Sequence, residues 1–237
     1  MRYTLLFAGI ASAASGLAAQ PDTSDYSPKE TRRLMFDYAK CVVGRREALA
    51  SQAILANVDN GAIMKSYPKL IDGACLVRET HADSKMSFKG DLYRYALADA
   101  LVNRQLANVP APDLANAPPL PQRAISDEPK PPAANSSKSE QRKYEAALRN
   151  YEQEQGFRAL TAYGECIVRT DTAGARTLLL TAPETPAEAA GFTAIHPALE
   201  QCLPEGETLA FGKVVLRGSI AVNYYRLAKA VAARPAG

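Results

Sequence analysis

Residues 38–43 read YAKCVV and residues 163–168 read YGECIV, so one short pattern occurs once in each half of the 237-residue chain. Further identities follow each copy, and all are cysteines, tyrosines, prolines, glycines or apolar residues. Such self-similarity indicates a tandem duplication. No carboxylate, histidine or nucleophile pair recurs, so the duplication preserves a scaffold. The matching residues are Tyr38, Cys41, Val43, Ala48, Ala50, Leu55, Pro68, Leu70, Cys75, Leu76 and Gly90 in the first half, and Tyr163, Cys166, Val168, Ala173, Ala175, Leu180, Pro197, Leu199, Cys202, Leu203 and Gly218 in the second.

The four cysteines stand at equivalent positions of the two halves. An even number with matched spacing is typical of disulfides in an oxidising compartment. A zinc site would need closely spaced cysteines or a mixture of cysteine and histidine, and the two histidines, His81 and His196, supply neither. Because a duplicated unit should carry its own cross-link, we predict bonds within each unit and no metal or other cofactor. The predicted pairs are Cys41 with Cys75 and Cys166 with Cys202.

Residues 1–19 have the parts of a secretory signal peptide: a cationic start at Arg2, a short apolar run and small residues before Gln20. That run is too short to span a membrane, and no later stretch approaches the roughly 18 to 20 apolar residues required. We therefore expect a periplasmic or secreted protein whose mature chain has no transmembrane segment.

Residues 109–140 are rich in proline and hold half of the 16 prolines of the chain. Proline fixes φ and removes a backbone donor, so we expect an extended, mobile linker rather than packed structure. A proline-rich recognition ligand is the alternative. The linker divides the chain into a helical module at residues 27–108 and a second at residues 141–233. Each module is small enough to benefit from a disulfide.

Helix-start signals dominate both modules and predict an all-α fold with about four helices in each. Ser27 and Thr185 are each followed directly by proline and, two positions later, by glutamate, a combination that caps a helix N-terminus. Short strand candidates at Met86 to Phe88 and Leu209 to Leu216 are too few to change this fold class. The other expected helices are a long one from about Ser139, short ones at Glu47 to Leu55 and Thr172 to Leu180, and last helices that begin at Gly90-Asp91 and Gly218-Ser219.

The least ordinary polar residues lie in the last helix of each half. Arg94 with Tyr95, and Tyr225 with Arg226, fall off the apolar stripes and are predicted to be exposed. Tyrosine and arginine often anchor interfaces, so these four residues form the predicted partner-binding surface. The alternative is that the tyrosines pack against the other half or against the linker.

Lys89 and Arg217 each precede the glycine that we expect to open a last helix. A cation there would lie near backbone N–H groups that favour anions, which makes the pair a candidate anion site. The alternative is an ordinary surface cation. We predict no catalytic residues, because neither His81 nor His196 has an equivalent in the other repeat.

Three features together resemble a group of uncharacterised exported helical repeat proteins of Gram-negative bacteria. The first is a Tyr that precedes a Cys followed by two β-branched residues. The second is a later Cys followed by Leu. The third is a cation and a Gly that open a Tyr-bearing helix. The resemblance covers both halves but not the linker. It implies a periplasmic or extracellular location and a two-cysteine helical repeat, and it brings no activity or site.

These observations favour a non-enzymatic protein that binds a partner or stabilises an assembly, the partner being a protein or another envelope component. Lys and Arg number 28 against 25 Asp and Glu, and they form no basic stripe that would fit nucleic acid. The alternative function is an exported hydrolase with an unrecognised site between the two modules.

Overall fold

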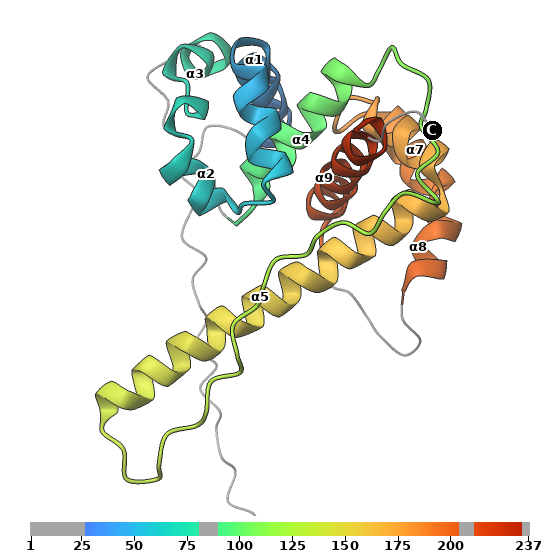
Figure 1. The fold of residues 1–237 in the computed structure, drawn as a ribbon. Helices are drawn as coiled ribbons and strands as arrows, with labels where there is room; N and C mark the ends of the chain where they lie inside the picture. Colours follow the sequence, from blue (N-terminus) through green and yellow to red (C-terminus); the bar gives the residue numbers. More distant parts are fainter. Residues whose placement is uncertain (1–26, 81–89, 204–210, 234–237) are drawn as a thin grey trace, which may run out of the picture.

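The computed structural model describes residues 27–80, 90–203 and 211–233, and within these ranges the chain is helical with no strands. The predicted all-α class is therefore confirmed for this part of the chain. The signal peptide, the strand candidate at residues 86–88, Lys89 and His81 lie outside it. The elements are α1 (Pro28–Leu55), α2 (Asn60–Ser66), a 3₁₀ turn (Pro68–Leu70), α3 (Gly73–Thr80), α4 (Leu92–Gln105), α5 (Lys138–Thr170), α6 (Thr172–Leu179), α7 (Pro186–Ala194), α8 (His196–Cys202) and α9 (Lys213–Ala232) (Figure 1).

The predicted helix starts at Ser27 and Thr185 are confirmed by their caps. The Ser27 hydroxyl accepts from the Glu30 amide, and the Glu30 carboxylate accepts from the Ser27 amide, so two otherwise unpaired donors are satisfied. The Thr185 hydroxyl accepts from the Glu188 amide at the start of α7. Ser137 opens α5 with a second complete capping box.

Both halves contain a break five residues after their first cysteine. In the first half Arg46 leaves helical geometry (φ −136°, ψ 38°), yet the helix resumes, so the short helix expected from Glu47 is the end of α1. In the second half Asp171 (φ −137°, ψ 75°) separates α5 from α6. The Asp171 carboxylate accepts from the Gly174 amide and thereby caps the new helix.

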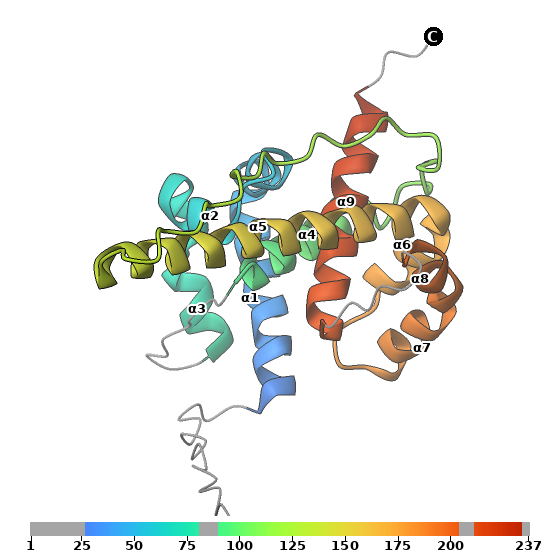
Figure 2. The same cartoon turned by 90° about the horizontal axis from the view of Figure 1, so that it is seen from below.

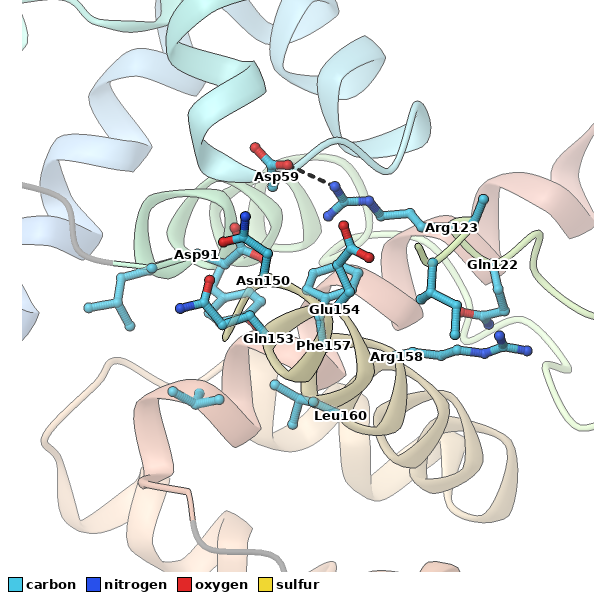
Figure 3. Close-up of a pocket in the computed structure, with 17 residues that line it drawn as sticks. Asp59, Asp91, Gln122, Arg123, Asn150, Gln153, Glu154, Phe157, Arg158 and Leu160 are labelled. Carbon is cyan, nitrogen blue, oxygen red and sulfur yellow. Dashed lines mark hydrogen bonds and ion pairs between the residues drawn. The ribbon is translucent and has the colours of Figure 1, made fainter. Parts of the chain in front are cut away.

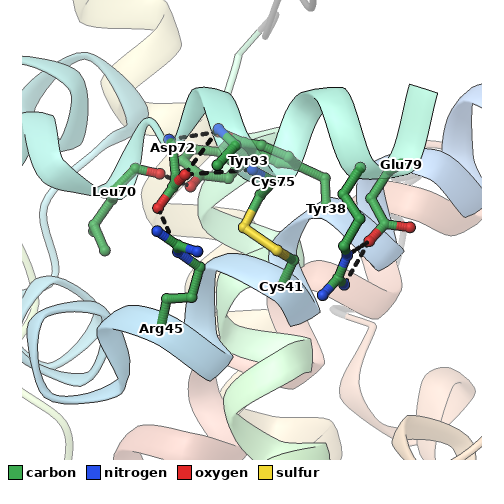
Figure 4. Close-up of a disulfide and its surroundings, with 10 residues drawn as sticks. Tyr38, Cys41, Arg45, Leu70, Asp72, Cys75, Glu79 and Tyr93 are labelled. Carbon is green, nitrogen blue, oxygen red and sulfur yellow. Dashed lines mark hydrogen bonds and ion pairs between the residues drawn. A yellow bond between two sulfur atoms is a disulfide. The ribbon is translucent and has the colours of Figure 1, made fainter. Parts of the chain in front are cut away.

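The two predicted disulfides are present. Cys41–Cys75 joins α1 to α3, and Cys166–Cys202 joins α5 to α8. Figure 4 shows the first bond beside Tyr38 and Tyr93, and the Tyr93 hydroxyl donates to the Leu70 carbonyl. In the second half the Tyr163 hydroxyl donates to the Leu199 carbonyl at 2.9 Å. Each disulfide is thus accompanied by a tyrosine whose hydroxyl ties its helix to a neighbouring segment, the 3₁₀ turn in the first half and α8 in the second.

Helices α4 and α9 cross and join the two halves through one continuous core of described residues. Helix α4 packs against α1 on one side and α9 on another, and α9 also packs against α5 (Figures 1 and 2). Gly218 lies at the crossing, where an added Cβ would come within 2.3 Å of Tyr95 Cβ. Glycine therefore permits the close approach of these helices. No helix of the described ranges has both the length and the apolar character needed to cross a bilayer.

The expected start of the last helix at Gly218-Ser219 is wrong. Helix α9 begins at Lys213, so the strand candidate that ends at Leu216 is also wrong over its helical part. Ser219 is a good capping residue by type, but its hydroxyl instead donates to the Leu160 carbonyl of α5 at 2.8 Å. The serine therefore serves a contact between helices.

Residues 110–137, here called the strap, form the connection between the halves. They contain no helix and run beside α5, whose first half projects from the body of the molecule (Figures 1 and 2). The expectation that this segment is unpacked is wrong, because Leu114, Ala117 and Leu120 are buried. The Arg169 guanidinium donates to the carbonyls of Ala117 at 2.6 Å and Pro118 at 2.8 Å. Proline lacks a donor but keeps its carbonyl acceptor, which the arginine fork satisfies.

Candidate functional site

A groove of about 900 Å³ lies where the strap, the middle of α5 and the first turns of α2 and α4 meet (Figure 3). Its apolar lining includes Leu92, Ile125 and Leu160, and amides and charged groups also line it. This volume falls in the range typical of small-ligand sites, about 300–1,000 Å³. The groove is therefore the candidate site.

One end of the groove is held by Asp59, which caps α2. Its Oδ1 accepts from the Ala62 amide at 2.7 Å, and its Oδ2 accepts from Arg123 Nη2 at 2.7 Å. Burial opposes ionisation of this carboxyl, but the amide and the guanidinium outweigh burial and hold the pKa of Asp59 below its usual value. An ion pair therefore fastens the strap to the first half of the chain.

The wall formed by Phe157 is fixed by two guanidinium groups. Arg94 lies 5.1 Å from the centre of the ring and Arg123 lies 4.8 Å from it, both within the range of cation–π attraction. The Arg94 side chain is 1% exposed and donates to Asn57 Oδ1 at 2.6 Å. Burial lowers the pKa of Arg94, although the neighbouring Asp91 opposes this change. The Phe157 ring and the two guanidinium groups of this wall therefore stabilise one another.

Other groups of the groove are available to a ligand. The side chains of Asn150, Gln153 and Arg158 are exposed on α5 and make no hydrogen bond or ion pair with the described part of the chain. Glu154 uses Oε2 to accept from the Ser126 amide at 2.7 Å, and this bond lowers its pKa. The groove therefore offers two amides, a guanidinium and a carboxylate that remains ionised at neutral pH.

The expectation that Arg94, Tyr95, Tyr225 and Arg226 are exposed is wrong. All four are buried, with exposures between 0% and 6%. The apolar-stripe rule assumes that a helix buries one face, but α4 and α9 are each packed by neighbours on several sides. These residues therefore do not form an outer surface for a partner, although Tyr95 also borders the groove.

Both tyrosines instead pack against the other half of the chain, as the alternative interpretation proposed, and Tyr95 does so against Gly218 of α9. The Tyr225 hydroxyl lies 2.7 Å from Ser51 Oγ and 2.9 Å from Gln105 Oε1, both in the first half. Arg226 donates to the Pro121 carbonyl of the strap at 2.9 Å. Burial, with a smaller contribution from the like charge of Arg94, lowers the pKa of Arg226 to about 10.

Arg217 is neither at a helix start nor on the surface. It is 3% exposed, and it donates to Asp99 at 2.7 and 3.1 Å and to Glu188 at 3.1 Å. Burial disfavours its charge, but these two carboxylates raise the pKa of Arg217 above its usual value. The anions that this cation binds are those of its own chain. Its predicted partner in an anion site, Lys89, lies outside the described residues.

The buried carboxylates around Arg217 were not predicted from the sequence. Arg32 of α1 binds Glu188 at 2.5 Å and Glu184 at 2.6 Å, so these charges and Arg217 with Asp99 form one ion-pair network. Burial raises the pKa of Asp99, and Arg217 opposes that rise. The available signal was Asp99 itself, a lone charge in the apolar run that begins at Tyr95.

Within the described ranges no group of three or more His, Cys, Asp and Glu side chains is arranged to hold a metal ion. Comparison with protein-family models, with curated proteins and with solved structures gives no match. Function is therefore inferred from the groove itself.

Proposed function

We propose that the protein is an exported, disulfide-stabilised binding protein that holds a segment of a partner in the groove. The observation that carries this proposal is the groove lined by Asn150, Gln153 and Arg158, whose polar groups have no partner in the described chain. A fixed wall with a few convergent polar groups is the usual composition of a ligand site. The binding surface proposed here replaces the one predicted from the sequence.

The same proposal includes two homologous helical modules joined by the strap. The matched disulfides and the matched breaks at Arg46 and Asp171 support a common origin of the halves. The shared core of α4 and α9 supports a rigid frame in which the two modules act as one unit. Such a frame would hold the groove in one shape before a partner arrives, which lowers the entropic cost of binding.

Binding is favoured over hydrolysis because the carboxylates Asp59 and Glu154 of the groove do not have the properties of a general acid. The described lining of the groove includes no histidine. The pKa values of Asp59 and Glu154 are lowered, whereas a general acid at neutral pH needs a raised one. Neither carboxylate is therefore suited to act as a general acid.

Gly156→Trp is expected to abolish partner capture and leave the fold intact. Gly156 lies on α5 in the lining of the groove, and an added Cβ there meets no atom within 4 Å. The indole ring would occupy the space of the ligand. Tryptophan also has a higher helix propensity than glycine, by a few tenths of a kcal/mol, so the melting temperature should hold or rise slightly. Capture from an extract of the source cells, read by mass spectrometry, measures the effect.

Gly44→Trp is the matched control. Gly44 is also an exposed helical glycine with no atom within 4 Å of an added Cβ, but it lies on α1 outside the groove. The partner is identified as the molecule that the wild type and Gly44→Trp both capture and that Gly156→Trp does not. Equal capture by all three proteins would refute binding in the groove.

A further inference from the structure

One side of the groove is a stretch of extended backbone with unused hydrogen-bonding groups. Arg123, Ala124 and Ile125 of the strap line the groove, and their backbone N–H and C=O groups make no hydrogen bond within the described chain. The flanking amide of Ser126 is bonded, but to the Glu154 side chain. An extended segment with unpaired backbone groups is a template to which another strand can pair.

The same side of the groove carries a cation, Arg158, that is free of partners in the described chain. Arg158 projects from α5 toward the side of the groove that holds Gln122, while Asn150 and Gln153 lie nearer Asp91 (Figure 3). The Arg123 charge is already matched by Asp59, whereas Arg158 has no partner in the described chain. An acidic side chain of a ligand would complete this charge.

From these two observations we infer that the ligand is an extended peptide. Its backbone pairs with residues 123–125, and it directs an acidic side chain to Arg158. Four strap residues, 122–125, span about 13 Å, which is enough for about four residues of peptide. The side-chain amides of Asn150 and Gln153 face the other side of the bound peptide. There they accept hydrogen bonds from its polar groups or donate hydrogen bonds to them. This inference rests on the proposed function and names the class of ligand.

Selection from a random hexapeptide phage library tests the inference. The wild-type protein should enrich peptides with Asp or Glu at one fixed position. Arg158→Glu should replace that preference with Lys or Arg, because the charge of its partner is reversed. Arg149→Glu is the matched control, since Arg149 is an exposed arginine of the same helix outside the groove, and it should leave the selected sequences unchanged.

Backbone pairing is tested on one selected peptide by N-methylation of each amide in turn. Successive N–H groups of a strand point to opposite sides, so methylation should weaken binding about tenfold at alternate positions and little between them. The inference would be overturned if methylation were tolerated at every position, or if the preference for an acidic residue survived Arg158→Glu. Either result would leave the groove as a binding site. Enrichment that Gly156→Trp does not reduce would place the peptides elsewhere and overturn the inference as well. If no peptide is enriched, the inference falls, whereas the proposed function is judged separately by capture from the extract.

Discussion

Arg217→Leu is expected to lower the free energy of unfolding by about 3–5 kcal/mol, the cost of breaking a buried ion pair on one side. The leucine would leave Asp99, which is 5% exposed, without its bidentate partner. It would also leave the Thr181 carbonyl, which accepts from Arg217 at 2.8 Å, without that donor. Urea unfolding followed by circular dichroism measures the change.

The double variant Arg217→Leu/Asp99→Leu should recover much of this loss, because no unpaired charge then remains at that position. Arg78→Leu is the control. Arg78 pairs with Glu79 while its own side chain is 64% exposed, and such surface pairs contribute about 1 kcal/mol or less. A loss below about 1 kcal/mol for Arg217→Leu would show that the network does not hold the halves together.

Removal of either disulfide is expected to cost about 4 kcal/mol on the chain-entropy model, since the closed loops span 34 and 36 residues. The two losses should nevertheless differ. Cys41 and Cys75 are buried in the core, whereas Cys166 and Cys202 are only half-buried. Replacement by alanine therefore also creates a core cavity in the first half, and that variant should be the less stable.

The comparison uses Cys41→Ala/Cys75→Ala and Cys166→Ala/Cys202→Ala in the same unfolding assay. Because the loop lengths nearly match, the difference between the variants reports packing around the sulfur atoms. An equal or larger loss in the second variant would contradict the packing described for the first disulfide.

Local features of the fold were predictable because their causes are local. The cap at Ser27 needs only a hydroxyl and a glutamate within four residues, and the disulfides follow from the duplication. The start of α9 was missed because Ser219 has the chemistry of a cap but is used between helices. The burial of Arg94 and Tyr225 was missed for a related reason: the hydrophobic pattern of one helix does not show how many neighbours pack against it.

The groove was beyond prediction because it is assembled from segments far apart in the chain. Asp59, Asp91, Arg123 and Phe157 come from four such segments and meet only when α2, α4, the strap and α5 are packed. The strap illustrates the difficulty. Its prolines are consistent with the absence of helix there, but its packing depends on the carbonyl acceptors that Arg169 binds, and a carbonyl has no signature in the sequence.

Hydrogen–deuterium exchange of the protein with and without a selected hexapeptide tests the groove most directly. The backbone amides of residues 123–125 have no acceptor in the described chain, so they should exchange fast in the free protein. When the peptide pairs with this stretch, exchange should slow markedly at the amides that face the peptide and little at those that alternate with them. The amides of α8 should keep their rates. Unchanged exchange at residues 123–125, with protection confined instead to the exposed apolar residues Ile71, just before α3, and Val77, within α3, would contradict the account.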